Sequence, residues 1–144
     1  YSLNCLTTLE PLKKLTKPTQ EAVENLAFTN GAIEGDLTAL QGFINLKNVK
    51  GDGNKITSLN GLQNHNKLQY LNMPINDIKN LDNVSKISTS LKRLDVRGNP
   101  NLYNISDVAN IKTLTQLWFT SKVADNKNDS DVNLNENDIL TIRR

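Results

Sequence analysis

The sequence contains few of the features that would identify a membrane-spanning, disulfide-linked or nucleic-acid-binding protein. It has a single cysteine, which excludes an internal disulfide, and no run of about 18 apolar residues that could cross a membrane. Its 17 basic and 15 acidic residues are mixed along the chain. Because no basic cluster could follow a phosphate backbone, we expect no nucleic-acid partner.

Catalytic motifs are missing as well. The sequence has no cysteine cluster, nucleophile elbow, phosphate-binding loop or dinucleotide fingerprint. The one histidine, His65, falls in a predicted loop, where we expect a solvated surface residue and neither a base nor a ligand. Cys5 is predicted to be a small buried hydrophobic residue rather than a reactive thiol. We therefore expect no catalytic residue, cofactor or metal ligand, and no enzyme activity.

What the sequence does contain is a repeated spacing of apolar residues. Residues 68–78, LQYLNMPINDI, follow the spacing L-x-x-L-x-M-x-x-N-x-I, which returns every 22 or 23 residues. The central apolar residues are Leu26, Val49, Leu71, Leu94 and Leu117, and one period outward lie Leu3 (with Cys5) and Leu140 (with Ile142). This is leucine-rich repeat spacing. It predicts an α/β solenoid of about six to seven repeats, each with one short parallel strand and a 3₁₀-helical, helical or irregular convex side.

An asparagine follows the central strand residue by five positions in the middle repeats. These residues are Asn54, Asn76 and Asn99, and the flanking repeats have Thr8, Gly31 and Lys122 instead. A buried asparagine amide can bond the unpaired backbone groups of neighbouring turns. We therefore predict an asparagine ladder that is sound only in the middle of the stack. Gly51, where a large residue is expected, predicts a weakly packed third strand.

The repeats divide the chain into one solenoid domain with two irregular ends. Residues 1–22 are interpreted as a partial repeat, residues 23–123 as regular repeats, and residues 124–144 as an irregular acidic loop with a terminal strand. Leucines at spacing three in residues 6–15 favour a short helical convex side, which Lys17-Pro18 is expected to end, and Thr19 is a predicted N-cap. A dedicated helical cap over residues 2–25 is the alternative.

The acidic segment 124–138 allows two interpretations. A calcium loop beginning at Asp129 would place Asp131 and Asn133 suitably, but Leu134 and Leu140 take the positions of the required glycine and glutamate. A structural loop is therefore favoured over a calcium site. This loop also offers an alternative to an exposed Trp118, since it would cover the Trp118 indole if it packed as part of a C-terminal cap.

Residues 54–59 (NKITSL) and 105–111 (ISDVANI) continue each strand with the pattern N-x-I-x-x-[LIV]-x-x-[LV]. In this feature, residues 20–120 resemble the short repeats of internalins, which are bacterial surface proteins that bind host receptors. The resemblance implies a cell-surface or secreted location and a protein ligand. Similar short repeats occur in cytoplasmic regulators of protein phosphatase 1 and in other intracellular scaffolds, which leaves a cytoplasmic regulatory scaffold as an alternative.

Strand alternation predicts which residues a ligand would meet. With Leu117 and Phe119 pointing inward, Trp118 points out to the concave face. The same rule places seven further residues there: Tyr70, Asn72, Arg93, Asp95, Arg97, Lys50 and Asp52. We predict a non-catalytic protein-interaction module that binds a protein ligand on this face, with Trp118 as anchor. A structural spacer within a larger surface protein is the alternative.

The ends of the sequence lead to one more expectation. The first predicted strand begins at Leu3 and the last one reaches Ile142, close to the two ends of the sequence. A strand edge at either end would present unpaired backbone groups. We therefore expect a piece of a longer protein, with weak self-association or fraying at a terminal strand.

Overall fold

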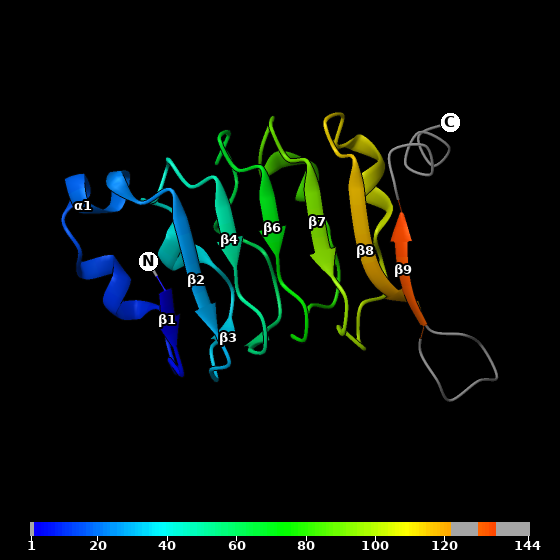
Figure 1. Ribbon diagram of the computed structural model, residues 1–144, viewed down its shortest axis with the longest axis horizontal. Coiled ribbons are helices and arrows are strands. Elements are labelled where there is room, and N and C mark those ends of the chain that lie inside the picture. Colours follow the sequence, from blue (N-terminus) through cyan, green and yellow to red (C-terminus); the bar gives the residue numbers. More distant parts are fainter. Residues whose placement is uncertain (1, 122–129, 135–144) are drawn as a thin grey trace.

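The computed structural model describes residues 2–121 and 130–134, which form a stack of coils with one sheet along its length (Figure 1). The strands are β1 (Ser2–Asn4), β2 (Asn25–Thr29), β4 (Asn48–Lys50), β6 (Tyr70–Asn72), β7 (Arg93–Val96), β8 (Gln116–Ser121) and β9 (Ser130–Leu134). They are neighbours in that order. The first six run parallel, as the repeat spacing predicts, and β9 pairs antiparallel with β8.

The opposite wall of the coils is made of short helical turns and a small second sheet. It comprises η1 (Glu10–Lys14), α1 (Lys17–Ala22), η2 (Thr38–Leu40), η3 (Val84–Lys86), η4 (Ser106–Asn110), and the paired strands β3 (Glu34–Gly35) and β5 (Lys55–Ile56). All of these elements except α1 are 3₁₀ turns or two-residue strands. Apolar residues spaced by about three fit such tight turns because 3₁₀ side chains superimpose every three residues. Among the described residues, no helix is long and apolar enough to cross a membrane.

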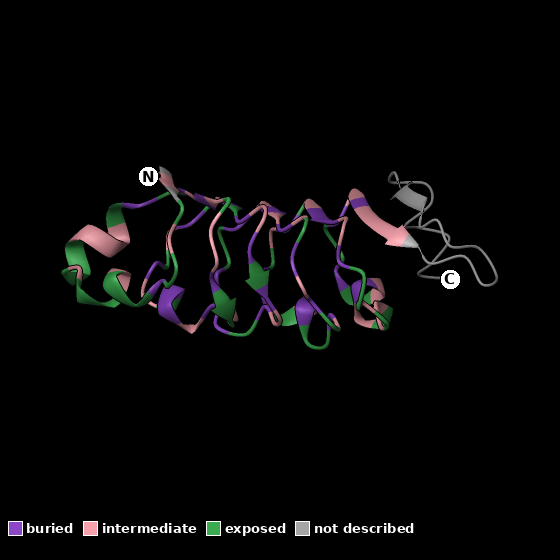
Figure 2. Ribbon diagram, turned by 90° about the horizontal axis from the view of Figure 1, so that it is seen from below, coloured by how far each residue is buried: buried purple, intermediate pink, exposed green. Residues whose placement is uncertain are grey.

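The register of the central strands agrees with the repeat spacing. Leu26 pairs with Val49, Val49 with Leu71, Leu71 with Leu94, and Leu94 with Leu117. These side chains lie inside the coils and are almost completely buried. Figure 2 shows the buried positions recurring from coil to coil. The core is therefore a continuous column built by stacking, and no coil encloses a core of its own.

Gly51 does not leave the gap that its small size suggests. An added Cβ would lie 2.5 Å from Cε2 of Phe28 and 2.7 Å from Sδ of Met73, so these two neighbours already fill the layer. Gly51 and Met73 are buried and Phe28 is 1% exposed. The prediction of a weakly packed third strand was wrong because the residues above and below Gly51 supply the missing volume.

The asparagine ladder is present as predicted. The Asn76 amide nitrogen donates to the carbonyl oxygens of Gly51 (3.0 Å), Pro74 (3.1 Å) and Met73 (3.3 Å), and its oxygen accepts from the Ile56 N–H (3.1 Å). Asn54 accepts from the N–H of residue 33 and Asn99 from that of residue 78 in the same way. Each asparagine thus joins its own turn to the preceding coil.

The first coil departs from the predicted register. Leu3 pairs with Phe28 rather than with Leu26, so β1 is displaced by two residues relative to the repeat. Cys5 consequently lies beyond the strand, has a positive φ of 61° and is exposed, which corrects its predicted burial. The predicted helix start was also wrong. Thr16, not Thr19, is the N-cap of α1 and accepts from the Thr19 N–H, and Lys17 and Pro18 begin the helix.

The last described strand also differs from the prediction. β9 lies within the segment predicted to be an irregular loop, and its alternating apolar and polar residues suit a strand. Pairing with β8 satisfies backbone groups that an open edge of the parallel sheet would leave unpaired. The strand predicted at Leu140 and Ile142 lies outside the described residues.

His65 is buried, with 2% of its surface exposed, which contradicts its predicted surface position. Its Nδ1 lies 3.0 Å from the Leu62 carbonyl oxygen, and its Nε2 lies 2.9 Å from the Leu40 carbonyl oxygen in the preceding coil. The ring therefore links two coils on the convex side, where the asparagine ladder does not reach. A loop assignment says nothing about burial, which is why the sequence misled.

A carboxylate also joins two coils on this side. The Asp107 carboxylate accepts from the Ser85 N–H (2.9 Å) and from the Asn110 amide (2.9 Å). Burial, the largest single influence, raises the pKa of Asp107, but these hydrogen bonds and the nearby charge of Lys86 outweigh it and lower that pKa below its ordinary value.

Candidate functional site on the concave face

The parallel register gathers the predicted site residues into adjacent columns on the open face of the sheet. Tyr70 pairs with Arg93, and Arg93 pairs with Gln116. The next column contains Lys50, Asn72, Asp95 and Trp118, each paired with the one before it. Inward residues alternate with outward residues along each strand, so the buried leucine column holds these side chains on the other face.

Arg93 is the centre of an aromatic cluster. Its guanidinium carbon lies 4.9 Å from the ring centroid of Tyr70 and 5.5 Å from that of Trp118. The guanidinium of Arg97 lies 4.7 Å from the Trp118 ring. All four side chains are half-buried. Cation–π contacts of this kind contribute about 0.5 to 1 kcal/mol each when exposed and more when desolvated, so the cluster is held in place before any ligand arrives.

Asp95 has a different role from the exposed contact that was predicted for it. Only 4% of its surface is exposed, because Arg97 covers it. The Arg97 Nε donates to Asp95 Oδ1 (3.0 Å), its Nη2 donates to Oδ2 (2.8 Å), and its backbone N–H also donates to Oδ1 (3.2 Å). This bidentate pair fixes the Arg97 guanidinium over Trp118. Asp95 therefore positions Arg97, whose guanidinium lies over the carboxylate.

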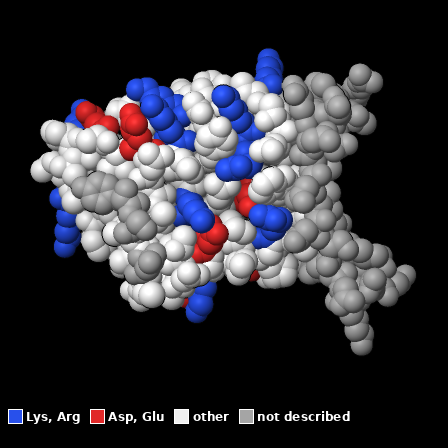
Figure 3. All heavy atoms as spheres, viewed as in Figure 1, with Lys and Arg blue, Asp and Glu red and all other residues white. Residues whose placement is uncertain are grey.

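Three buried side-chain atoms on the same face have no hydrogen-bond partner among the described residues, and one of them is Oδ1 of Asn48, which pairs in register with Tyr70. The other two are Oδ1 of Asp52 and Nε of Arg93. Burial is the main influence that raises the pKa of Asp52 above its ordinary value, and the positive charge of Lys50 partly opposes it. Figure 3 shows basic and acidic side chains together on this face. Lys50 is exposed and Asn72 half-buried, as the predicted site requires.

No metal site or cofactor site is evident in the part of the chain that the structure describes. There, no three histidine, cysteine, aspartate or glutamate side chains come together as a possible metal site. The candidate calcium loop lies largely outside the described residues. Cys5 and His65 are far apart in the sequence and lie in different coils. The described side chains of the concave face are aromatic, cationic, acidic and amide groups, and they include no assembled nucleophile and base.

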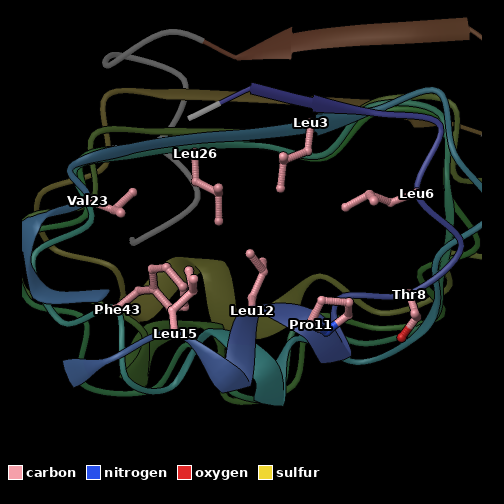
Figure 4. Close-up of a pocket in the computed structure, with 9 residues that line it drawn as sticks. All are labelled: Leu3, Leu6, Thr8, Pro11, Leu12, Leu15, Val23, Leu26 and Phe43. Atoms are coloured by element: carbon pink, nitrogen blue, oxygen red, sulfur yellow. The ribbon is translucent and has the colours of Figure 1, made fainter. Parts of the chain in front are cut away.

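A partly open cavity of about 260 Å³ lies between the first coil and the second. Its lining is apolar except for Thr8, and includes Leu3, Leu12, Val23 and Phe43, whose side chains point into a common space between the strands and η1 (Figure 4). The two-residue displacement of β1 changes which side chains face this space. We interpret the cavity as loose packing of the terminal coil.

Sequence alternation found the residues of the concave face but missed their contacts with one another. Alternation also carried a usable signal for the Asp95–Arg97 pair, since residues two apart on a strand share a face. It carried none for the placement of Arg93 between two rings. That contact depends on side-chain conformations across three coils.

Parallel coils of 22 to 23 residues, a buried leucine column and an asparagine ladder define a leucine-rich repeat protein. No family model matches the chain. It is similar to leucine-rich repeat-containing protein 36 from Homo sapiens, at 35% identity over 116 residues, and from Mus musculus, at 34% over 119 residues. These matches cover 74% and 76% of this chain, but the chain spans only 15% and 16% of the length of these relatives.

The fold is shared with an internalin (InlF) from Listeria monocytogenes. The TM-score is 0.61 and the sequence identity is 20%, and the match covers 81% of this chain and 40% of that chain. At this identity the likeness shows the fold alone. Together the matches confirm the predicted solenoid with internalin-like repeats, and they support a protein-interaction scaffold as the general class of function.

Proposed function

We propose that this chain is a non-catalytic module that binds a protein ligand on the concave face of its sheet. The observation that carries the proposal is the cluster of Tyr70, Arg93, Trp118 and Arg97, which are half-buried side chains held against one another on one open surface. Tryptophan, tyrosine and arginine dominate the energetics of protein interfaces. Concave solenoid surfaces also present many side chains to one partner.

The rigidity of the cluster supports the proposal. Tyr70, Arg93 and Trp118 lie on hydrogen-bonded strands, and the Asp95 carboxylate holds Arg97, just after β7, by two side-chain hydrogen bonds. A side chain that is already ordered loses little conformational entropy on binding, whereas immobilising a free one costs about 0.5 to 1.5 kcal/mol. The cluster is therefore suited to act as a preformed anchor.

The extracellular location, the bacterial origin and the spacer and cytoplasmic-scaffold alternatives remain predictions. The internalin resemblance favours a surface or secreted protein, and the sequence relatives are mammalian. Concave-face binding does not depend on the location, so it is tested with the isolated chain.

The test begins with selection of 16-residue peptides from a display library on the immobilised chain. Dissociation constants of the selected peptides are then measured by fluorescence anisotropy with a labelled peptide. We expect Tyr70→Ala and Trp118→Ala each to weaken binding at least fivefold. The control is Tyr103→Ala, because Tyr103 is 76% exposed and lies outside the seven-stranded sheet. This control should bind as the parent does.

Urea unfolding of every variant shows whether the loss of binding is local. If Tyr103→Ala weakens binding while Tyr70→Ala and Trp118→Ala leave it unchanged, the binding site lies away from the sheet. Failure of the library to yield any peptide that depends on Tyr70 or Trp118 would count against the proposal in the same way.

A further inference from the structure

The guanidinium of Arg93 has no anionic partner among the residues that the structure describes. It forms no ion pair or hydrogen bond with any described residue, and its Nε is buried without an acceptor. Its neighbours on the face are the uncharged rings of Tyr70 and Trp118. The rings stabilise the cation through their faces and leave the hydrogen-bonding edge of the guanidinium without an acceptor.

Other cations along the sheet are placed differently. Arg97 is paired with Asp95 (2.8 Å), and Lys47 is paired with Glu24 (3.4 Å). Lys50 is exposed and lies close enough to Asp52 to influence its titration. Arg93 is thus a half-buried cation at the centre of the proposed anchor, and no carboxylate among the described side chains forms an ion pair with it.

Covering Arg93 with a neutral surface would remove water from an unpaired charge, which is unfavourable unless the ligand supplies an anion. We infer that the protein ligand of the concave face presents an aspartate or glutamate side chain, whose carboxylate pairs with Arg93 between the two rings. The inference rests on the proposed function and names the chemistry that the ligand must carry.

A carboxylate fits this position better than a phosphate group. A phosphate carries close to two negative charges near neutral pH, and sites that hold it gather several unpaired donors. Here Arg97 is already engaged by Asp95, and the carboxylates of Asp52 and Asp95 lie on the same face. One unpaired guanidinium matches the single charge and planar shape of a carboxylate.

The test is a double-mutant cycle with a peptide selected on the concave face. Each Asp or Glu of the peptide is replaced in turn by Asn or Gln, and dissociation constants are measured for the parent chain and for Arg93→Gln. We expect one replacement to weaken binding to the parent at least tenfold and binding to Arg93→Gln less than twofold. Phosphoserine at that peptide position should bind no better than the original acidic residue.

The matched control is Lys92→Gln. Lys92 is exposed, adjacent in the chain and equal in charge, so this variant removes one positive charge and leaves the aromatic cluster in place. It should retain the tenfold dependence on the peptide carboxylate. Arg93→Lys, which keeps the charge but loses the planar fork, should show an intermediate dependence. Urea unfolding checks that each variant is folded.

The outcomes separate this inference from the function on which it rests. A peptide that needs Tyr70 and Trp118 but loses nothing when its acidic residues are replaced would overturn the inference and leave the proposed function standing. Equal losses in Lys92→Gln and Arg93→Gln would show a general charge effect and also overturn it. Binding that is unchanged in Tyr70→Ala and Trp118→Ala would overturn both the inference and the proposed function.

Discussion

Replacing Asn76 by alanine tests whether the asparagine ladder holds the coils together. The substitution removes the acceptor of the Ile56 N–H, which is buried and has no other hydrogen-bond acceptor among the described residues. Strand pairing between β3 and β5 uses the N–H groups of residues 55 and 57 and leaves that of Ile56 unpaired. An unsatisfied buried donor costs about 1 to 3 kcal/mol.

The carbonyl groups that accept from Asn76 are affected less than the Ile56 N–H, because they keep other donors. Gly51 still accepts from the Asn54 amide (3.2 Å), and Met73 still accepts from the Asn99 amide (3.1 Å). They lose a second hydrogen bond but remain paired, so we add about 1 kcal/mol for these groups together. Asn76→Ala should therefore lower the free energy of unfolding by about 2 to 4 kcal/mol.

Urea unfolding, followed by far-ultraviolet circular dichroism, measures this loss as a lower transition midpoint. Asn110→Ala is the control because Asn110 is exposed and its amide reaches only the side chain of Asp107 (2.9 Å). A surface change of this kind should cost about 0.5 kcal/mol or less. Equal losses in the two variants would refute the ladder as a source of stability.

Three further changes test other parts of the stack. Gly51→Ala should cost about 1 to 3 kcal/mol through overpacking against Phe28 and Met73, and a smaller side chain at position 73 should recover part of this loss in urea unfolding. His65→Ala should cost about 2 kcal/mol, since it leaves a cavity and removes the ring contact between coils, and an unchanged midpoint would contradict its role as a link between coils. Asp107→Ala should destabilise the chain near neutral pH. Because the folded-state pKa of Asp107 is lowered, this difference should disappear as the pH falls through that pKa, below the ordinary value of 3.8, and a difference that persists there would refute the assignment.

The repeat spacing was sufficient to predict the central coils. A strand leucine that returns at a fixed period can be buried in every coil only if the coils are stacked in register, so Leu71 and Leu94 align without further information. The positions of Asn76 and of the outward-facing Trp118 follow from the same period. These residues depend on local alternation and nearest-neighbour stacking, which the sequence expresses directly.

The ends of the stack and the side-chain contacts could not be predicted in this way. A terminal coil has a neighbour on one side only, so the period no longer constrains it, and β1 is displaced by two residues. Pro18 was interpreted as ending a helix, although proline is equally suited to a first helical turn. The burial of His65 and the position of Arg93 between two rings depend on neighbouring coils, which the period does not describe.

The in-register stacking also affects how the binding surface could change during evolution. Tyr70, Arg93 and Trp118 come from three successive coils, so each contact between them crosses a boundary between repeats. Loss of residues 70–92 as one unit would put Arg93 in the position of Tyr70 and beside Asn48, while Val49 would meet Leu94 and the buried column would remain continuous. Gain or loss of whole repeats could therefore replace the neighbours of Arg93 at little cost to the core, whereas the deletion of one residue within a coil would shift its inward-facing residues out of the buried column.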